Sequence, residues 1–532
     1  MHTWLSHTGL VLALGLAACA PAAPPPTTGV PAAPVPPAAE IRAAQQSIKI
    51  GTAFSLSTLS PRGALPPAPF LYWPMYDNLT QFGPKYEVRP SVAEKWSVSP
   101  DGRTWTFNLR KDVKFWNGQP VTAEDVAFSL TQVVRSRWPS IGFFASVTEA
   151  TAVDQSTLRV TSRQPDMAIP NGGSYLWIIP KAYYEEVGAD AFGDKAVGSG
   201  PYEVAEYRPG DTVRFRKRSE PHAFRKPAND EIIFRTIPDP NQRANGLRTG
   251  EIDLSAGTSF LPDLAENLTR SGVTVLSQPG AVVLLTMSQG VAEARNTALK
   301  DKRVRQALNY AIDRESLAKN LYKGTAVPIS QVALPGSPYF DESARPIPYD
   351  VATAKRLLAE AGYPTGFKLP GGLDTSIAHG YRDLVLAIQS SLKQIGVEFE
   401  VNFVESGEYD DRARAVGGKM RGDLWAHASS DANGFGSTIR SLYGCGKPVP
   451  EPAFALFWCN TAWDKAMDEA LATADPAKRQ QLLHEANRIQ REDVPAIFIV
   501  ATPVQIAHVA KIRGVEFPVP IFYGFDTVYR IQ

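Results

Sequence analysis

The sequence is poor in the residues that build metal centres. Of its 532 residues only 3 are cysteines and 7 are histidines. No two histidines are four positions apart, the spacing that lets one helix face present both rings to zinc. We therefore predict no metal site, and no motif indicates a bound cofactor.

Neither sign of charge is in excess. The chain carries 55 Lys and Arg residues against 54 Asp and Glu residues, a net charge of +1. A nucleic-acid-binding surface needs a concentrated set of basic residues to neutralise phosphates. The balance therefore gives no reason to expect a nucleic-acid partner.

Common enzyme motifs are also missing. The sequence has no HExxH, GxSxG or Walker motif. Two Ser-x-x-Lys matches remain, Ser316 with Lys319 and Ser390 with Lys393, which leave a serine–lysine hydrolase as an alternative. Such an enzyme also needs a downstream Lys-Thr-Gly, and the nearest string reads Lys-Gly-Thr. We interpret both matches as helix surface and predict that the chain is not an enzyme.

Long apolar runs are absent beyond the first twenty residues. Residues 9–18 form a run that is too short to cross a bilayer and suits a signal peptide. The run ends in Leu-Ala-Ala-Cys19, which resembles a bacterial lipobox whose cysteine is lipidated. The alternative is a plain signal peptide, because residues 1–6 lack Lys and Arg. We predict a lipoprotein signal peptide over residues 1–19, with lipid attached to Cys19.

A proline- and alanine-rich segment follows. Proline at this density holds the backbone extended and leaves no pattern that forms a core. Residues 20–46 are therefore predicted to tether a folded part to a membrane, outside the cytoplasm. The two other cysteines, Cys445 and Cys459, are fourteen positions apart, and an exported chain meets an oxidising compartment. We predict that they form a disulfide.

The rest of the chain alternates between strand and helix patterns. Trp96 and Val98 precede a Pro-Asp-Gly turn, after which Trp105, Phe107 and Leu109 alternate as in a hairpin. Further along, a helical pattern over residues 384–395 leads into a strand pattern over 397–403. Helix followed by strand, repeated, predicts α/β lobes, and the hairpins indicate mixed sheets.

Several sequence blocks share one resemblance. The densest is residues 90–130, PSVAEKWSVSPDGRTWTFNLRKDVKFWNGQPVTAEDVAFSL; others are GSGPY at 198–202 and DKRVRQALNYAIDRESLAKNLYKG at 301–324. In this order and spacing they resemble the extracellular solute-binding proteins of peptide, nickel and opine ABC importers, bacterial family 5. The resemblance extends from about residue 47 to the C-terminus.

The resemblance implies a two-lobed periplasmic binding protein fold of type II, cluster C-like. Lobe I would comprise residues 47–284, completed by 505–532, and lobe II residues 285–504. The chain would cross between the lobes near residues 284–285 and return near 501–505. A hinge would then let the lobes close on a ligand.

The implied function is capture of a small peptide or peptide-like solute and its delivery to the permease subunits of an ABC transporter, by a monomer anchored outside the cytoplasmic membrane. A non-peptide ligand such as an opine, an oligosaccharide or a metal chelate is the nearest alternative. A receptor that binds solute without feeding a transporter is a further one, and the serine–lysine lipoprotein hydrolase is the most distant.

Candidate ligand-binding residues come from the same resemblance. In peptide-binding relatives, a tryptophan matching Trp425 is followed by an aspartate that pairs with the ligand ammonium group, but here that position is Ala428. Asp431 is the next acidic residue and would replace it, or the ligand lacks a free amino terminus, because a buried ammonium without a counter-ion is costly. His427 is a further candidate in this stretch.

Three candidates lie elsewhere. Arg382 is near, but out of register with, the arginine that some dipeptide binders offer to the ligand carboxylate. Tyr72 and Trp73 lie where the family places a wall of its ligand site. Aromatic walls with a few fixed polar groups are typical of enclosed small-molecule sites.

Overall fold

The computed structural model describes residues 46–531 apart from several internal segments: 64–68, 84, 137, 258–259, 288–296, 377–380, 405–423, 430–438, 441–442, 446–457 and 517–523. The signal peptide, Cys19 and almost all of the predicted tether lie outside the described residues. So does Asp431. Within the described part, no helix is both long and apolar enough to cross a membrane.

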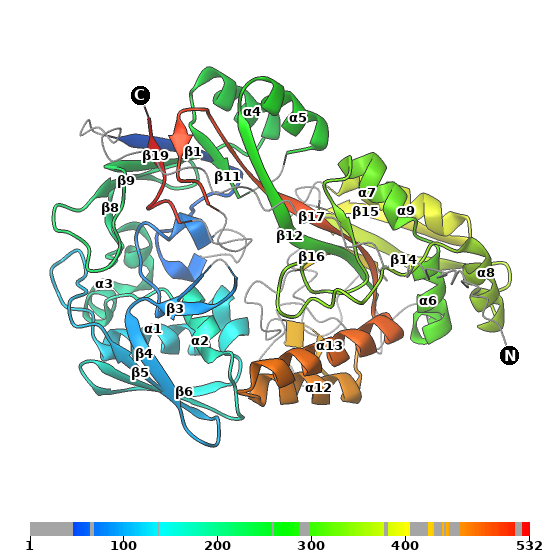
Figure 1. Cartoon of the computed structure of the whole chain (residues 1–532), viewed down its shortest axis with the longest axis horizontal. Helices are drawn as coiled ribbons and strands as arrows, with labels where there is room; N and C mark the ends of the chain where they lie inside the picture. Colours follow the sequence, from blue (N-terminus) through cyan, green and yellow to red (C-terminus); the bar gives the residue numbers. More distant parts are fainter. Residues whose placement is uncertain are drawn as a thin grey trace, which may run out of the picture.

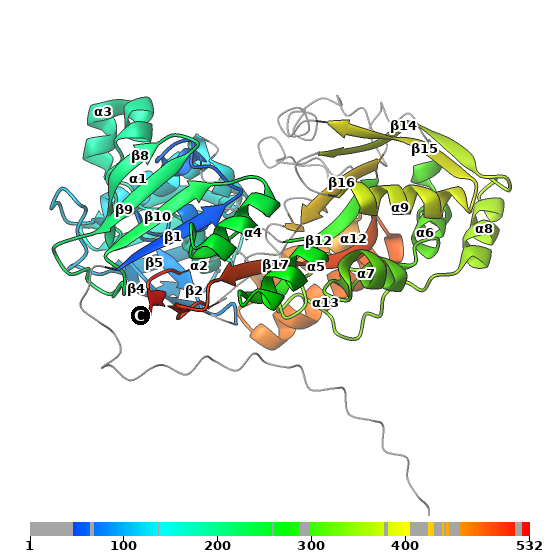
Figure 2. The ribbon, with the colours of Figure 1, turned by 90° about the horizontal axis from the view of Figure 1, so that it is seen from above.

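One large sheet runs through both halves of the molecule (Figures 1 and 2). Among the described residues it has 11 strands. Its neighbouring strands are, in order, β15 (Val397–Val404), β14 (Phe367–Ser376), β16 (Leu424–Ser429), β12 (Thr274–Met287), β17 (Ala496–His508), β11 (Leu254–Ala256), β1 (Ser47–Thr52), β10 (Glu231–Thr236), β9 (Thr212–Lys217) and β8 (Tyr202–Arg208), with β13 (Val327–Pro328) paired to β17.

The two longest strands, β12 and β17, connect the halves. They pair antiparallel from Thr274 opposite His508 to Thr286 opposite Ala496. The register shifts between Pro279 and Ala281, and Pro279 lies opposite Pro503. Because proline has no N–H group, neither strand can donate a ladder hydrogen bond at this pair. Both strands thus lack a backbone donor near the point where they pass from one half to the other.

The hydrophobic cores change at the same place. The first-half core draws on residues from Ile48 to Ala256 and again from Ile506 to Val528. The second half has one core on each face of its sheet, and their members fall between Val282 and Ala501. Val275 of β12 packs with the first half, whereas Val282 packs with the second. The core boundary thus lies a few residues before Leu284 and Leu285.

The first half carries a second, antiparallel sheet. Its strands, in order, are β4 (Ala93–Val98), β5 (Thr104–Leu109), β7 (Thr157–Ser162) and β6 (Val147–Asp154). The predicted hairpin is confirmed, since Trp96 pairs with Phe107 and Val98 with Trp105. A small ribbon joins β2 (Thr80–Phe82) to β3 (Val88–Pro90).

Helices cover the sheets. Those of the first half are α1 (Ala123–Arg135), α2 (Ile169–Gly172), α3 (Lys181–Asp194), α4 (Pro240–Thr249) and α5 (Pro262–Arg270). Those of the second half are α6 (Lys302–Tyr310), α7 (Arg314–Tyr322), α8 (Val351–Glu360), α9 (Arg382–Lys393), α12 (Thr461–Ala472) and α13 (Pro476–Asp493). The second half is thus a helix–sheet–helix sandwich, with α6, α8 and α9 against one core and α12 and α13 against the other.

The end of the chain returns to its beginning. Phe525 and Val528 belong to the first-half core, and β18 (Ile512–Arg513) pairs with β19 (Tyr529–Arg530). The side chain of Gln46 donates a hydrogen bond of 3.0 Å to the carbonyl of Arg530. Residues more than 480 positions apart therefore close one half of the molecule.

Candidate functional site

Three strands of the second half end on the side that faces the first half. β14 is parallel to both β15 and β16, so their carboxyl ends lie at one edge of the sheet. Figure 2 shows the arrowheads of β14 and β15 directed toward the first half. Ligands of open α/β sheets bind at the carboxyl ends of the strands. This edge is the candidate site.

Arg382 lies at this edge, as the first residue of α9. Its side chain is exposed, and its guanidinium lies 5.0 Å from the ring centroid of Phe403, near the end of β15. No carboxylate of the described residues is within ion-pair distance of it. An aromatic face orients a guanidinium without neutralising it, so Arg382 can bind an anionic group.

Trp425 and His427 are on β16, also beside this edge. Trp425 pairs with Thr286 of β12 and with Asp374 of β14, and His427 pairs with Leu284. Their side chains, like all of Asp431, are outside the described part of the chain. In the sheet, β14 lies between β16, which carries Trp425 and His427, and β15, which carries Phe403. No more is established for Trp425 and His427.

The aromatic candidates of the first half are buried. Tyr72, Trp73 and Tyr76 are 3%, 7% and 0% exposed. The Tyr72 hydroxyl donates to the Thr58 carbonyl at 3.1 Å, and the Tyr76 hydroxyl donates to the Leu59 carbonyl at 2.8 Å. Burial raises the pKa of Tyr72 far above its usual value, so its hydroxyl stays protonated. Trp73 is the most exposed of the three.

Trp73 is held by a charged neighbour that the sequence did not indicate. The Arg225 guanidinium lies 4.8 Å from the Trp73 ring centroid, and its Nη1 donates to the Trp73 carbonyl at 2.9 Å. Asp526 accepts two hydrogen bonds from Arg225, at 2.7 and 3.0 Å. The two residues are 301 positions apart, and no local pattern relates them.

A buried histidine completes this cluster. His222 Nδ1 accepts hydrogen bonds from the backbone N–H groups of Phe224 and Arg225, so its Nε2 must carry the proton that it shares with Asp77, 2.9 Å away. Burial would raise the pKa of Asp77, but His222, Arg225 and Ser199 together lower it. Each charged group of the cluster thus has a partner within it, and we assign the cluster to the support of Trp73.

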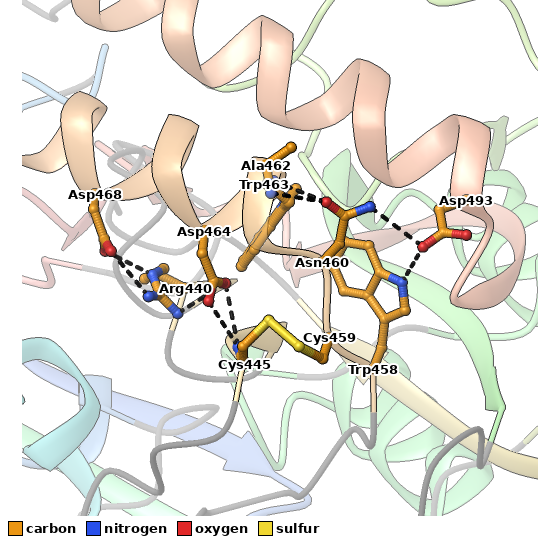
Figure 3. The surroundings of a disulfide bond; sticks show 10 residues. All are labelled: Arg440, Cys445, Trp458, Cys459, Asn460, Ala462, Trp463, Asp464, Asp468 and Asp493. Atoms are coloured by element: carbon orange, nitrogen blue, oxygen red, sulfur yellow. Dashed lines mark hydrogen bonds and ion pairs between the residues drawn. A yellow bond between two sulfur atoms is a disulfide. The ribbon is translucent and has the colours of Figure 1, made fainter.

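Cys445 and Cys459 are joined in the structure, with their Sγ atoms 2.19 Å apart (Figure 3). The backbone N–H of Cys445 donates to Asp464 of α12, whose carboxylate is also within 3.3 Å of Arg440. Cys459 directly precedes Asn460, whose side chain caps α12. The bond therefore fixes the segment that leads into α12.

Both serine–lysine pairs lie on the surface of helices. Ser316, Lys319, Ser390 and Lys393 are all exposed on helices. The Ser316 hydroxyl donates to Asp313, the N-cap residue of α7, at 2.7 Å. These placements agree with helix surface. No group of three or more His, Cys, Asp or Glu residues in the described ranges is arranged to hold a metal ion.

A groove of about 620 Å³ lies on the second half, away from the strand ends. It is lined by Asp341, Lys478 and further polar residues of α13. Its Arg488 already pairs with Glu485 and Glu492. Because this charge is satisfied within α13, the groove is a weaker candidate than the strand edge.

Comparison with known proteins agrees with this geometry. The family model described as bacterial extracellular solute-binding proteins, family 5 Middle, matches residues 87–447. The glutathione-binding protein GsiB of Salmonella typhimurium is 29% identical over 462 residues, covering 85% of this chain and 88% of GsiB.

Solved structures share the fold. The periplasmic binding protein DppA of Helicobacter pylori, in complex with the peptide STSA, matches with a TM-score of 0.77 at 23% identity, over 91% of this chain and 98% of DppA. MoaA of A. tumefaciens R10, in complex with mannopinic acid, matches with a TM-score of 0.76 at 25% identity, over 92% of this chain and all of MoaA. The predicted type II periplasmic binding protein fold is confirmed, and the chain belongs to the bacterial extracellular solute-binding proteins of family 5.

Proposed function

We propose that this protein captures a small peptide or peptide-like solute bearing a carboxylate, in a cleft between its two halves, and delivers it to an ABC permease. The observation that carries the proposal is the exposed guanidinium of Arg382, stacked on Phe403 at the carboxyl ends of the strands that face the first half. A guanidinium that is oriented by an aromatic ring, and that has no ion-pair partner among the described residues, suits a carboxylate.

The relatives bind ligands of this chemistry. Glutathione, the peptide STSA and mannopinic acid, which are named with GsiB, DppA and MoaA, all carry carboxylates. A peptide is the favoured ligand, and an opine is the second candidate because MoaA is 25% identical to this chain. Trp425, His427 and Asp431 would line the second-half side of the cleft. The first-half side would lie near Tyr72 and Trp73, of which only the edge of Trp73, 7% exposed, could reach a ligand.

The halves would act as lobes. Residues 47–284 and 505–532 would form lobe I, and residues 285–504 lobe II. Proline at both Pro279 and Pro503, next to a register shift, supports a hinge there, since neither residue can donate a ladder hydrogen bond. Closure would bury the ligand and present a new surface to the permease.

Export and anchoring complete the proposal. Residues 1–19 would direct export, lipid on Cys19 would hold the protein at a membrane, and residues 20–46 would let the folded part reorient. The oxidising compartment would keep Cys445 and Cys459 paired. The protein would act as a monomer and catalyse no reaction.

The test measures ligand binding to Arg382 variants. Thermal shifts are recorded for the wild type with glutathione, the peptide Ser-Thr-Ser-Ala and mannopinic acid. A ligand at 100 times its Kd stabilises the folded state by about 2.7 kcal/mol. We expect at least one of them to bind, and Arg382→Ala to weaken that binding by about tenfold or more, because a charge-assisted hydrogen bond contributes about 1.5–3 kcal/mol.

The matched control is Arg356→Ala. Arg356 is also an exposed helical arginine of the second half, but it is paired with Glu360 on α8. Its loss should leave ligand affinity unchanged. Equal binding by the wild type and Arg382→Ala would exclude Arg382 as the carboxylate anchor, and turnover of any of the three probes would exclude a pure binding role.

A further inference from the structure

The two halves also touch away from β12 and β17. Lys323, which follows α7, pairs with Asp263 and Glu266 of α5, and these three side chains are exposed. A buried contact lies elsewhere. The backbone N–H of Met167, between β7 and α2 of the first half, donates a 2.7 Å hydrogen bond to the carbonyl of Leu471 in the last turn of α12. Figure 1 shows α12 reaching across the lower part of the view toward α2 and β6. Met167 and Leu471 are 8% and 5% exposed.

The acceptor is one that α12 cannot satisfy by itself. The last four carbonyls of an α-helix have no partner within the helix. In α12, Thr473 serves two of them, since its hydroxyl donates to Glu469 and its N–H to Ala470. Leu471 receives its donor from the other half of the molecule. Separating the halves therefore removes the helix cap as well as the contact.

The donor is held in position by Asp166. The Asp166 carboxylate accepts a 2.8 Å hydrogen bond from the N–H of Ala168 and another from the hydroxyl of Ser146. Its backbone carbonyl accepts from Trp105 Nε1 at 2.8 Å. These contacts fix the residues on both sides of Met167, so its N–H points outward from a rigid turn.

The acceptor is equally well anchored. Trp463, Met467 and Ala470 of α12 are buried in a second-half core. Arg440 makes two hydrogen bonds to Asp468 of the same helix. Because the turn at Met167 and the helix α12 are each fixed within their own half, neither can move with the other half. The hydrogen bond between Met167 and Leu471 therefore breaks when the halves separate at this place.

We propose that the turn at residues 166–168 and the last turn of α12 form an interlobe latch, which favours the closed arrangement even without ligand. The proposal rests on the two-lobed function above, since it assumes that the halves move. The latch would set the fraction of ligand-free molecules that are closed. A larger closed fraction raises the ligand affinity, because less of the binding free energy is then used to close the protein.

The test uses small-angle scattering of the ligand-free mature protein. Met167→Pro removes the donor N–H, whereas Met167→Leu keeps it with a similar side chain. A hydrogen bond contributes about 0.5–1.5 kcal/mol, so the ratio of closed to open molecules should fall about 2- to 12-fold in Met167→Pro. We expect a larger radius of gyration for Met167→Pro than for wild type and Met167→Leu, whose radii should agree.

A second pair of variants keeps the test decisive if Met167→Pro does not fold. Asp166→Ala removes the acceptor that shapes the turn, and Asp166→Asn retains an acceptor for the N–H of Ala168. Asp166→Ala should open the protein and Asp166→Asn should not. Scattering that is identical for all folded variants would overturn the latch, and this outcome leaves the Arg382 binding test unaffected because no ligand is present.

Discussion

Asp166 and Asp77 are both buried carboxyls, yet their surroundings move their pKa values in opposite directions. Burial raises the pKa of Asp166 to about 6, and hydrogen bonds from Ser146 and Ala168 only partly oppose it. Burial also acts on Asp77, but His222 and Arg225 outweigh it and lower the pKa. The difference is the cationic Arg225 beside Asp77, since the partners of Asp166 are the neutral donors Ser146 and Ala168.

The raised pKa of Asp166 predicts the direction in which stability changes with pH, relative to Asp166→Asn. Between pH 4 and 6 the folded protein keeps a proton on Asp166 that the unfolded chain, with a pKa near 3.8, has lost. The free energy of unfolding of wild type relative to Asp166→Asn should therefore fall by about 3 kcal/mol as the pH rises through this window, and stay level above it.

Urea unfolding of both proteins at pH 4, 5, 6 and 8 measures this difference. A difference that rises with pH would mean that the carboxylate is stabilised as an anion. A flat difference would mean that Asp166 titrates normally.

At the scale of elements, the strand β12 shows where the sequence was informative. The apolar run of residues 281–285 predicts a strand, whereas the observed strand begins at Thr274. The part of β12 before Ala281 has no clear strand pattern, because it contains Pro279 and Gly280, and both residue types are unfavourable inside strands. They are accommodated by a register shift next to Pro503 of the partner strand, and pairing between distant strands is not visible in local sequence.

Helix boundaries were easier to predict. Thr122 and Asp125 form a capping box at the start of α1, and Asp350 and Asp475 cap α8 and α13. Capping depends on side chains within three residues of each other, so local sequence contains the whole signal. The candidate site depends instead on tertiary contacts, such as the one between Arg382 and Phe403, and only the family resemblance pointed to it.

Gly280 lies where β12 and β17 pack too closely for a larger residue. A Cβ at this position would lie 2.4 Å from Cβ of Val504. Gly280→Ala should destabilise the protein by about 1–3 kcal/mol through overpacking. Val504→Ala keeps that Cβ but removes the two γ-carbons, one of which would lie 2.6 Å from the new atom, so it should recover part of the loss.

A double-mutant cycle from urea unfolding quantifies the coupling between these two residues. Additive effects of the two substitutions would show that the strands do not meet here as described.

At the scale of the whole molecule, the C-terminal segment secures the first half. Arg225 and Asp526 form a buried pair, with 6% and 19% of their side chains exposed. Asp526→Asn leaves the guanidinium without its main counter-charge, and breaking a buried pair costs about 3–5 kcal/mol. We expect a loss of this size in the unfolding transition of the first half.

Asp190→Asn is the matched control. Asp190 also pairs with an arginine, Arg62, but its side chain is 95% exposed. Exposed pairs contribute about 0–1 kcal/mol, so calorimetry should detect little change. Similar losses for both variants would show that Asp526 does not have a special role.

Because the C-terminal segment packs in the first half, it also affects the order in which the two halves can fold. The cores of the second half use one continuous stretch, from Val282 to Ala501, whereas the core of the first half needs Phe525 and Val528. When the chain is delivered N-terminus first, the second half can fold while the first still exposes apolar strands. The residues that are delivered first are thus among the last to become protected, and in that interval chaperones and proteases have access to them.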